Sequence, residues 1–167
     1  EDLDYVFTGR WKNEKGYREN SEARSWHVGA DVGYQVTEDI ETRFEWSFYD
    51  AYYELPGALT RSDIDQLGRK ASRTPNDNVQ VTDWFIRPII NAYGFSLSLP
   101  YRKRVYRYRS TCWISYAATN TFNPDLKYVF ENDWTTFTAG VDFQDSTTRS
   151  HDPMNTSTIS RKDIGFY

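Results

Sequence analysis

The sequence predicts an all-β protein, built as an antiparallel up-and-down sheet of about eight strands. Three observations support this fold class. Apolar side chains recur at every second position through most of the chain, which is the period of a strand with one apolar face. Of the 167 residues, 38% are hydrophobic and 17% are aromatic, and strands favour aromatic residues. Long and short polar connections alternate along the chain.

Four segments show the alternation most clearly. Within residues 40–48, one face carries Ile40, Thr42, Phe44, Trp46 and Phe48, and the other carries Glu41, Arg43, Glu45 and Ser47. The same pattern runs through 26–34, 122–130 and 137–143. Because successive side chains of a strand point to opposite sides, each segment has one apolar and one polar face.

Four further segments show the same period less regularly, namely Tyr5–Trp11, Val79–Asn91, Phe95–Tyr106 and Lys162–Tyr167. Pro88 falls inside the second of them, although proline has no N–H to donate to a strand ladder. We interpret Pro88 as a bulge or as a shift of register. No segment has the apolar period of a helix.

The connections between these segments differ in length in a regular order. Three are tight, at 36–39, 91–94 and 131–134, and four are long and polar, at about 13–23, 51–78, 107–120 and 146–160. In an up-and-down sheet, this order brings every long connection to the same end. Outer-membrane β-barrels have this asymmetry, with short periplasmic turns and long extracellular loops.

The two faces indicate which one would meet lipid. The polar faces are rich in charged residues and glycine, as a packed or watery interior would be. The apolar faces carry rings suited to a membrane–water boundary toward the strand ends, at Trp11, Trp26, Tyr34, Trp46 and Trp84. They carry almost no Lys or Arg, which would cost roughly 2–4 kcal/mol at mid-depth. The pattern therefore favours a segment of an antiparallel up-and-down transmembrane β-barrel.

One basic run departs from this rule. In "YRKRVYRYR", residues 101–109, Lys103 falls on the apolar side of the strand. We interpret the run as a strand that rises above the bilayer, where both faces are wet. Its charge would attract the phosphates of lipopolysaccharide or another anionic ligand; the alternative is a solvated strand end without a partner.

Charge and residue usage argue against several classes of function. A net charge of -4 is too balanced for a nucleic-acid partner, and no apolar run has the length of a spanning helix. Cys112 is the only cysteine, and the two histidines, His27 and His151, are far apart in the chain. Neither a catalytic thiol nor a metal-ligand spacing is present. We expect no enzyme activity, no cofactor and no metal site.

Several longer stretches resemble one family. They are "YYELPGALTRSDID" at 52–65, "FNPDLKYVF…FTAGVDFQDSTTR" at 122–149, "ISRKDIGFY" at 159–167 and "GYRENSEARSWHVGADVGYQVTEDI" at 16–40. The first resembles the tyrosine-rich start of a loop in TonB-dependent outer-membrane receptors. The others are similar to strand pairs and loop–strand–turn patterns of the same barrels. The likeness covers nearly the whole chain in the expected order.

The resemblance implies a protein of the bacterial outer membrane. Members of this family are barrels of about twenty-two strands closed around an N-terminal plug domain. They import an iron–siderophore complex or a similar scarce nutrient with energy from TonB, and they sit among outer-membrane lipid and lipopolysaccharide. Residues 1–167 hold no plug and only about eight strands. We therefore expect one partial barrel domain, cut at both ends, that meets plug and TonB only through other parts of a longer chain.

The resemblance also suggests which residues would meet a ligand. Aromatic rings stack on siderophores and arginine binds anionic chelates, so the candidates are loop residues of these types, namely Tyr52, Tyr53, Arg61 and Arg109. The charges of the polar faces would line the ligand route or contact the plug, or else be ordinary solvated charges; they are Asp31, Glu41, Arg43, Glu45 and Asp142.

Two other interpretations fit the strand pattern. The stretches Gly9-Arg10-Trp11 and Thr82-Asp83-Trp84 resemble lipocalin motifs, which would imply a soluble eight-stranded barrel with a small apolar ligand inside. A small, self-contained eight-strand outer-membrane barrel also fits the strand count and the length. Detergent dependence separates the soluble carrier from either membrane protein.

Overall fold

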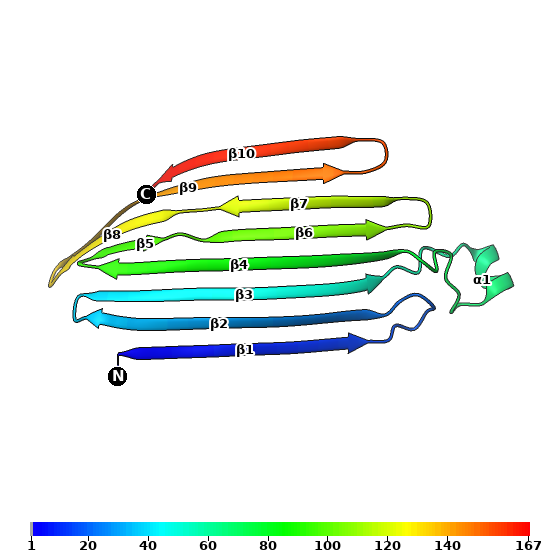
Figure 1. Ribbon diagram of the computed structural model, residues 1–167, viewed down its shortest axis with the longest axis horizontal. Coiled ribbons are helices and arrows are strands. Elements are labelled where there is room, and N and C mark those ends of the chain that lie inside the picture. The colour runs from blue at the N-terminus through cyan, green and yellow to red at the C-terminus, as the bar shows by residue number, and fades with distance from the viewer. Residues whose placement is uncertain (1) are drawn as a thin grey trace.

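The computed structural model describes residues 2–167, which form one antiparallel sheet and one short helix (Figure 1). The strands are β1 (Leu3–Glu14), β2 (Ala23–Thr37), β3 (Ile40–Glu54), β4 (Asn78–Ala92), β5 (Phe95–Ser98), β6 (Tyr101–Arg109), β7 (Ile114–Phe122), β8 (Asp125–Asn132), β9 (Thr135–His151) and β10 (Thr156–Phe166). The helix, α1, spans Arg61–Leu67 between β3 and β4. Within 2–167, no helix is long or apolar enough to cross a membrane.

The strands follow one another across the sheet in chain order once two interruptions are allowed for. β5 and β6 continue each other beside β4, and β7 and β8 continue each other beside β9. The ten strands therefore make eight spans, from β1 at one edge to β10 at the other (Figure 1). This confirms the antiparallel up-and-down sheet of eight segments that the alternation predicts.

Three prolines, Pro88, Pro100 and Pro124, explain the interruptions. At every second pair of an antiparallel ladder, the two opposite residues exchange two N–H···O bonds. Proline has no N–H, so each of these pairs keeps one bond. The remaining bonds run from Leu99 N–H to Pro88 O (3.0 Å), from Asn123 N–H to Pro100 O (3.1 Å) and from Phe143 N–H to Pro124 O (2.9 Å).

Pro88 is neither a bulge nor a register shift, contrary to the expectation from the sequence. It lies opposite Phe44, and the pairing of β3 with β4 is continuous on both sides of it. Its missing N–H falls on the side of β5, where Leu99 still donates its own. The sheet therefore tolerates a proline inside a central strand for the loss of one hydrogen bond.

The two ends of the sheet differ as the connection lengths predict. At one end, which we call the short-turn end, the strands are joined by the pairs 38–39, 93–94 and 133–134. Tyr93 and Gly94 both have positive φ, at 52° and 83°, as in the type I′ turn that matches strand twist. At the other end, the loop end, the connections are 15–22, 55–77, 110–113 and 152–155.

Two of the four predicted long loops are short, and their residues are mostly strand. β6 continues to Arg109 and β7 begins at Ile114, while β9 continues to His151 and β10 begins at Thr156. These strand ends carry mostly polar residues without a regular alternation, so backbone pairing continues where the alternation of hydropathy stops. The alternation also misses α1, which Thr60 and Asp63 begin with a reciprocal capping box.

Three of the four connections at the loop end form one cap. Arg18 donates hydrogen bonds to the carbonyl oxygens of Pro56, Gly57 and Ala71. Asn20 donates to those of Leu55, Thr74 and Asp77. The Asp77 carboxylate accepts from Thr111 and from the Tyr108 hydroxyl. Residues 15–22, 55–77 and 110–113 are thereby held together, which gives the polar loops a defined shape.

The sheet encloses no apolar core. Among residues 2–167, the buried hydrophobic residues are Ala51, Val79 and Ala118. β1 and β10 make no contact with each other in the described chain, so the sheet is open at both edges. A lipocalin-like barrel needs large apolar side chains inside a closed sheet, and a complete eight-strand barrel needs paired edges. The structure contradicts both alternatives.

Candidate functional site

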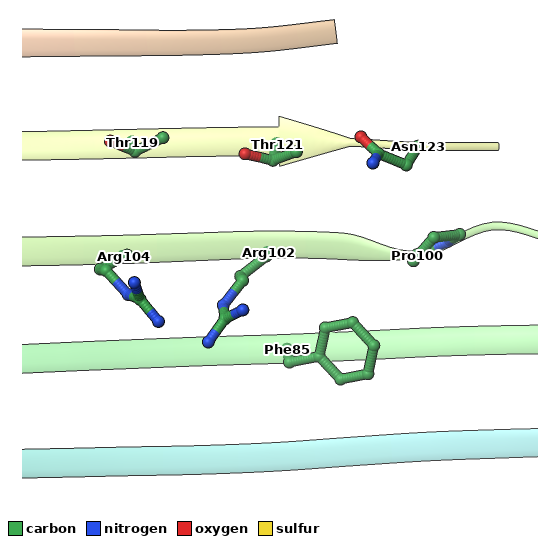
Figure 2. Close-up of a pocket in the computed structure, with 7 residues that line it drawn as sticks. All are labelled: Phe85, Pro100, Arg102, Arg104, Thr119, Thr121 and Asn123. Carbon is green, nitrogen blue, oxygen red and sulfur yellow. The ribbon is translucent and has the colours of Figure 1, made fainter. Parts of the chain in front are cut away.

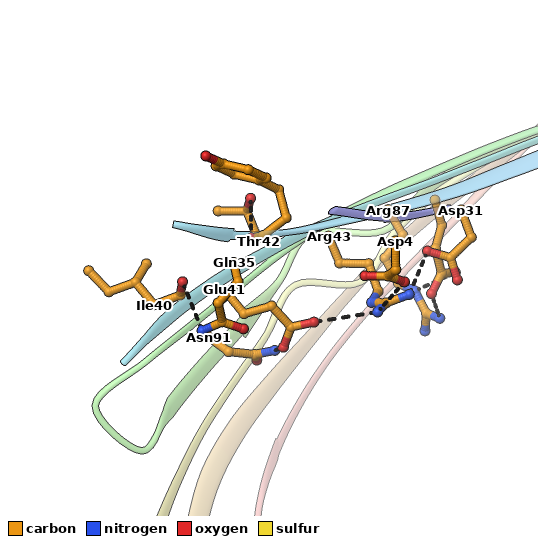
Figure 3. Close-up of polar contacts among 11 residues, drawn as sticks. Asp4, Asp31, Gln35, Ile40, Glu41, Thr42, Arg43, Arg87 and Asn91 are labelled. Atoms are coloured by element: carbon orange, nitrogen blue, oxygen red, sulfur yellow. Dashed lines mark hydrogen bonds and ion pairs between the residues drawn. The ribbon is translucent and has the colours of Figure 1, made fainter. Parts of the chain in front are cut away.

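The sheet has two chemically distinct faces. We call the face that carries Trp26, Phe44 and Phe137 the outward face; these side chains are 43%, 47% and 58% exposed. The opposite, inward face carries Glu41 and Arg43, and the later strands curve around that side (Figure 3). Large apolar side chains on the outward face are thus covered by nothing within residues 2–167.

The apolar part of the outward face ends at a regular boundary. Near the loop end, the outward face carries only scattered large apolar or aromatic residues, namely Tyr52, Val105, Tyr116 and Ile114. The continuous apolar run of each span ends before them, and its last residue is, in order, Trp11, Trp26, Phe48, Trp84, Tyr101, Phe122, Phe143 and Ile164. These residues face each other in four pairs, Trp11 with Trp26, Phe48 with Trp84, Tyr101 with Phe122 and Phe143 with Ile164. Between the pairs, Trp26 faces Asp50, Trp84 faces Lys103 and Phe122 faces Asp145. The boundary therefore moves two residues toward the short-turn end at every second span.

We call this stepwise boundary the staircase. Its slope gives the tilt of the strands at which the boundary would lie perpendicular to a barrel axis. On average, the boundary shifts by one residue from each strand to the next. With a rise of 3.3–3.4 Å per residue and about 4.8 Å between strands, the line of the boundary lies about 35° from the perpendicular to the strands. Strands of membrane barrels tilt by roughly 35–45°. Residues 40–48 rise about 27 Å along β3, or about 22 Å at this tilt, close to the roughly 25 Å of a barrel's apolar band. When the strands tilt as barrel strands do, the border of the apolar band therefore lies perpendicular to the barrel axis.

Aromatic rings mark the boundary. Phe48 lies between Trp26 and Trp84, with ring centroids 4.7 Å and 4.4 Å away. Trp46 lies one step inside the band and 6.3 Å from Trp84. Tyr34 belongs to the opposite border, near the short-turn end. Rings at both borders of an apolar band are typical of a membrane–water boundary.

Ion pairs and a hydrogen bond join four strands on the inward face (Figure 3). The Arg43 guanidinium lies 3.0 Å from carboxylate oxygens of Asp4 and Asp31 and 3.4 Å from Glu41. The Asn91 amide donates to Glu41 at 3.0 Å. Gly33 makes room for this cluster, since a Cβ there would lie 2.9 Å from Arg43 Nη2. These residues come from β1, β2, β3 and β4, so the cluster fixes the register of four strands.

Of the two other charges predicted on the polar face, Glu45 forms an ion pair and Asp142 lies apart from the cluster. Glu45 accepts a hydrogen bond from Arg87 Nε at 2.9 Å across β3 and β4. Asp142 is not part of the cluster, and its carboxylate lies over Gly165 of β10. Asp31, Glu41 and Arg43 therefore belong to one cluster, whereas Glu45 forms a separate ion pair with Arg87.

A second charged cluster, centred on Asp83 of β4, lies farther toward the loop end. The Asp83 side chain is buried and accepts hydrogen bonds from Arg102 and Arg104 at 2.6–3.0 Å. Both arginines extend from β6 toward β4 (Figure 2). Together they border a hollow of about 390 Å³ that also meets Phe85, Pro100, Thr119, Thr121 and Asn123. The Asn123 Oδ1 atom is buried without a hydrogen-bond partner among residues 2–167.

A hollow of about 370 Å³ lies on the inward face near the loop end of β1, β2 and β3. The hydroxyls of Tyr49 and Tyr53 hydrogen-bond each other there at 2.7 Å. Arg10 and His27 also border this hollow. A cation, an imidazole and two phenols in one open hollow can hold an anionic ligand with polar or aromatic parts.

The structure separates the four ligand residues predicted from the sequence. Tyr53 borders the inward hollow, whereas Tyr52 and Arg109 border a hollow of about 240 Å³ on the outward face. Arg61 is exposed on α1, 3.6 Å from Asp65. Their role in binding stays a prediction. Sequence reasoning missed Arg10 and Tyr49, because only strand register shows that they lie beside Tyr53.

No group of three or more His, Cys, Asp or Glu side chains in the described chain converges as metal ligands.

Comparisons with known proteins support the fold. No protein-family model matches the sequence, and no curated protein matches it. A solved structure that matches is the crystal structure of the ferric citrate transporter FecA in its unliganded form, with a TM-score of 0.60 and 16% sequence identity. The match covers 95% of this chain and 27% of that chain. The chain therefore has the fold of a segment of that protein, over about a quarter of its length.

Proposed function

We propose that this chain is a section of the wall of an outer-membrane receptor of the TonB-dependent type, which binds and imports an iron–siderophore complex or a similar scarce nutrient. The staircase boundary of the apolar band carries the proposal. A sheet packed against a soluble domain has no reason to end its apolar face along a line set by barrel tilt, whereas a bilayer requires it.

The same boundary sets the orientation that we propose. The apolar band lies next to the two-residue turns, and between the boundary and the cap both faces carry mostly polar or charged residues. The short-turn end would face the periplasm, and the cap would stand in water outside the cell. Trp11, Trp26 and Trp84 would lie at the outer membrane–water boundary.

The inward face supplies the groups for ligand contact. The hollow bordered by Arg10, His27, Tyr49 and Tyr53 lies near the loop end, where a nutrient would enter. FecA, which has this fold over a segment of its chain, is a ferric citrate transporter. An anionic iron chelate is accordingly the ligand class that we propose, and the role is binding and passage rather than catalysis.

Tryptophan fluorescence in lipid vesicles tests the membrane position. Lipids brominated on the acyl chains should quench Trp46, inside the band, but not Trp113, in the connection 110–113. Trp46→Phe should lower the quenched fraction, and Trp113→Phe should raise it. Equal quenching in both variants, or a chain that stays monomeric in buffer without detergent, contradicts the membrane position.

A titration of the detergent-solubilised chain with ferric citrate and with a ferric hydroxamate tests the ligand site. Tyr53→Phe and Arg10→Gln should weaken binding by about fivefold to tenfold each, because each removes about 1–1.4 kcal/mol of hydrogen bonding or charge. Arg109→Gln, on the outward face, is the matched control. A loss confined to Arg109→Gln would move the site to the outer side of the loops.

A further inference from the structure

Two tyrosines of β3 bring their hydroxyls together above a small residue. Tyr49 and Tyr53 lie four residues apart, about 13 Å along the strand, yet their hydroxyl oxygens are 2.7 Å apart. Ala51, the inward-facing residue between them, is 1% exposed. The two rings therefore lean toward each other from opposite sides of Ala51, and they hold both oxygens at one point of the inward face.

The distance between the two oxygens matches the spacing of adjacent ligands around one metal ion. In an octahedral site with metal–oxygen bonds of about 2.0 Å, adjacent oxygens lie about 2.8 Å apart. Phenolate oxygen is a ligand of ferric iron in haem proteins. One ferric ion can therefore bind both oxygens with little movement of either ring.

The charges around the pair suit an anionic iron chelate rather than a free cation. Arg10 lies opposite His27, and His27 lies opposite Tyr49, so all three share one row across β1, β2 and β3. Lys12 and Glu14 also border the hollow, and they pair with each other at 2.8 Å. Within residues 2–167, Arg10 makes neither an ion pair nor a side-chain hydrogen bond. The hollow therefore keeps one uncompensated positive charge, which attracts an anion and repels a free ferric ion.

We propose that Tyr49 and Tyr53 bind the iron of a ferric carboxylate chelate directly, as phenolate ligands, while Arg10 binds a carboxylate of the chelate. Arginine binds carboxylates through charge-assisted hydrogen bonds. Both tyrosines lie on the loop-end side of Phe48, the boundary residue of β3, so a chelate reaches them from water. The inference rests on the proposed function, because it states how the inward hollow would hold an iron chelate.

The binding step is an exchange of ligands on the iron. Each phenol forms an iron–oxygen bond and loses its proton. For each bond formed, one bond from the iron to a chelate carboxylate or to a bound water breaks. The proton passes to the released carboxylate or to solvent water. The iron stays ferric throughout, so the step needs neither an oxidant nor a reductant.

Visible absorption of the detergent-solubilised chain with ferric citrate tests the proposal. Charge transfer from phenolate to ferric iron gives a visible band that ferric citrate alone lacks, and the unmodified chain should show it. The double variant Tyr49→Phe, Tyr53→Phe should lose the band. It should also bind ferric citrate at least about tenfold more weakly, because even residues behind a metal ligand contribute about 10–100-fold to metal affinity.

The control variant Tyr5→Phe, Tyr116→Phe removes two phenols from the outward face. It should keep both the band and the affinity for ferric citrate. Arg10→Gln should weaken binding by about fivefold to tenfold and keep the band at saturation, because Arg10 contacts the chelate and not the iron. A band that persists in the double variant of Tyr49 and Tyr53 would overturn the assignment of the ligands.

Chromium(III) citrate provides a second arm, because chromium(III) exchanges its ligands too slowly to accept a phenolate during a titration. The unmodified chain should bind ferric citrate at least about tenfold more tightly than chromium citrate. The double variant Tyr49→Phe, Tyr53→Phe should bind the two chelates alike. Equal affinity of the unmodified chain for both chelates would overturn direct ligation.

These outcomes separate the inference from the proposed function. If ferric citrate binds, Arg10→Gln weakens it and no band appears, the hollow holds an intact chelate, so the proposed function stands and direct ligation is wrong. If ferric citrate does not bind the unmodified chain, the proposed ligand class is wrong and this inference falls with it. Should the double variant fail to insert into vesicles, the single variants Tyr49→Phe and Tyr53→Phe provide the test. Each should weaken or shift the band, and an unchanged band in both would overturn the proposal.

Discussion

At the scale of single residues, the inward face depends most on Arg43. One guanidinium serves three carboxylates, those of Asp4, Asp31 and Glu41, and its side chain is 29% exposed. Without it, three anions from neighbouring strands would lie within a few ångströms of each other. Like charges at that distance repel, and partly buried ones are screened less than exposed ones.

Arg43→Gln should therefore destabilise the sheet by about 1–2 kcal/mol at neutral pH. Denaturant unfolding at pH 7 measures this loss. Arg161→Gln, which removes one exposed pair with Asp163, is the control, and an equal loss in the two variants would show that the cluster has no special weight.

At the scale of the element, α1 is held by its first turn rather than by an apolar face. Asp63 accepts from the Thr60 N–H at 2.9 Å and pairs with Arg73. The Arg73 hydrogen bond, followed by those of Thr60, holds the pKa of the Asp63 carboxyl well below its ordinary value. A seven-residue helix is too short to be stable alone, so these contacts decide whether it forms.

A lowered pKa in the folded state means that ionised Asp63 stabilises the loop. The contribution is complete above the ordinary carboxyl pKa of about 3.9 and is lost as the pH falls below it toward the folded value. Asp63→Asn should remove this pH dependence and speed hydrogen exchange at the amides of residues 61–67. Asp65→Asn, on the exposed side of α1, should leave exchange unchanged. Identical protection at pH 5 and pH 2.5 in the unmodified chain would contradict the assignment.

The strands show a second effect at this scale. β6, β7, β9 and β10 all continue past the boundary of the apolar band. Beyond it, both faces are wet, so neither face selects apolar residues and the period of two disappears. Backbone pairing does not need that period, because the ladder is made by N–H and C=O groups common to all residues except proline.

At the scale of the whole molecule, the boundary of the apolar band is set by register across all eight spans. Each strand carries only its own end of the band, and the staircase emerges when the strands are paired. If the band lies in a bilayer as proposed, depth in the membrane rather than sequence position should decide what a charged substitution costs.

Phe44→Arg places a charge inside the band, two steps below the boundary residue Phe48 of β3, and Thr82→Arg places one just above it on the neighbouring strand. The first should cost about 2–4 kcal/mol and the second about 0–1 kcal/mol. Unfolding by guanidinium from phosphatidylcholine vesicles measures both. Similar costs at the two positions would mean that the outward face does not meet lipid.

For the inward charges too, the alternation assigns the face and the register of the strands decides the contacts. Alternation alone assigns Asp31, Glu41, Arg43 and Glu45 to one face. The structure pairs Asp31 with Arg43 and Glu45 with Arg87 across strands, while Glu41 pairs with Arg43 of its own strand. It also takes Tyr52 and Arg109 away from Tyr53, because neighbouring residues of one strand project to opposite sides. When these residues are assigned to loops, the alternation of their side chains between the two faces is not considered. The sequence therefore groups Tyr52, Tyr53 and Arg109, although the sheet places Tyr53 on the opposite face from the other two.

The sequence by itself determined the eight spans, the two faces and the end with short turns, because burial against lipid or water imprints a period of two on any strand that has one apolar side. Only the tertiary structure decided where strands continue through polar sequence, which cations are paired, how the three prolines are accommodated and that the apolar boundary descends as a staircase. These depend on register, and register is a relation between strands that the hydropathy of a single strand does not contain.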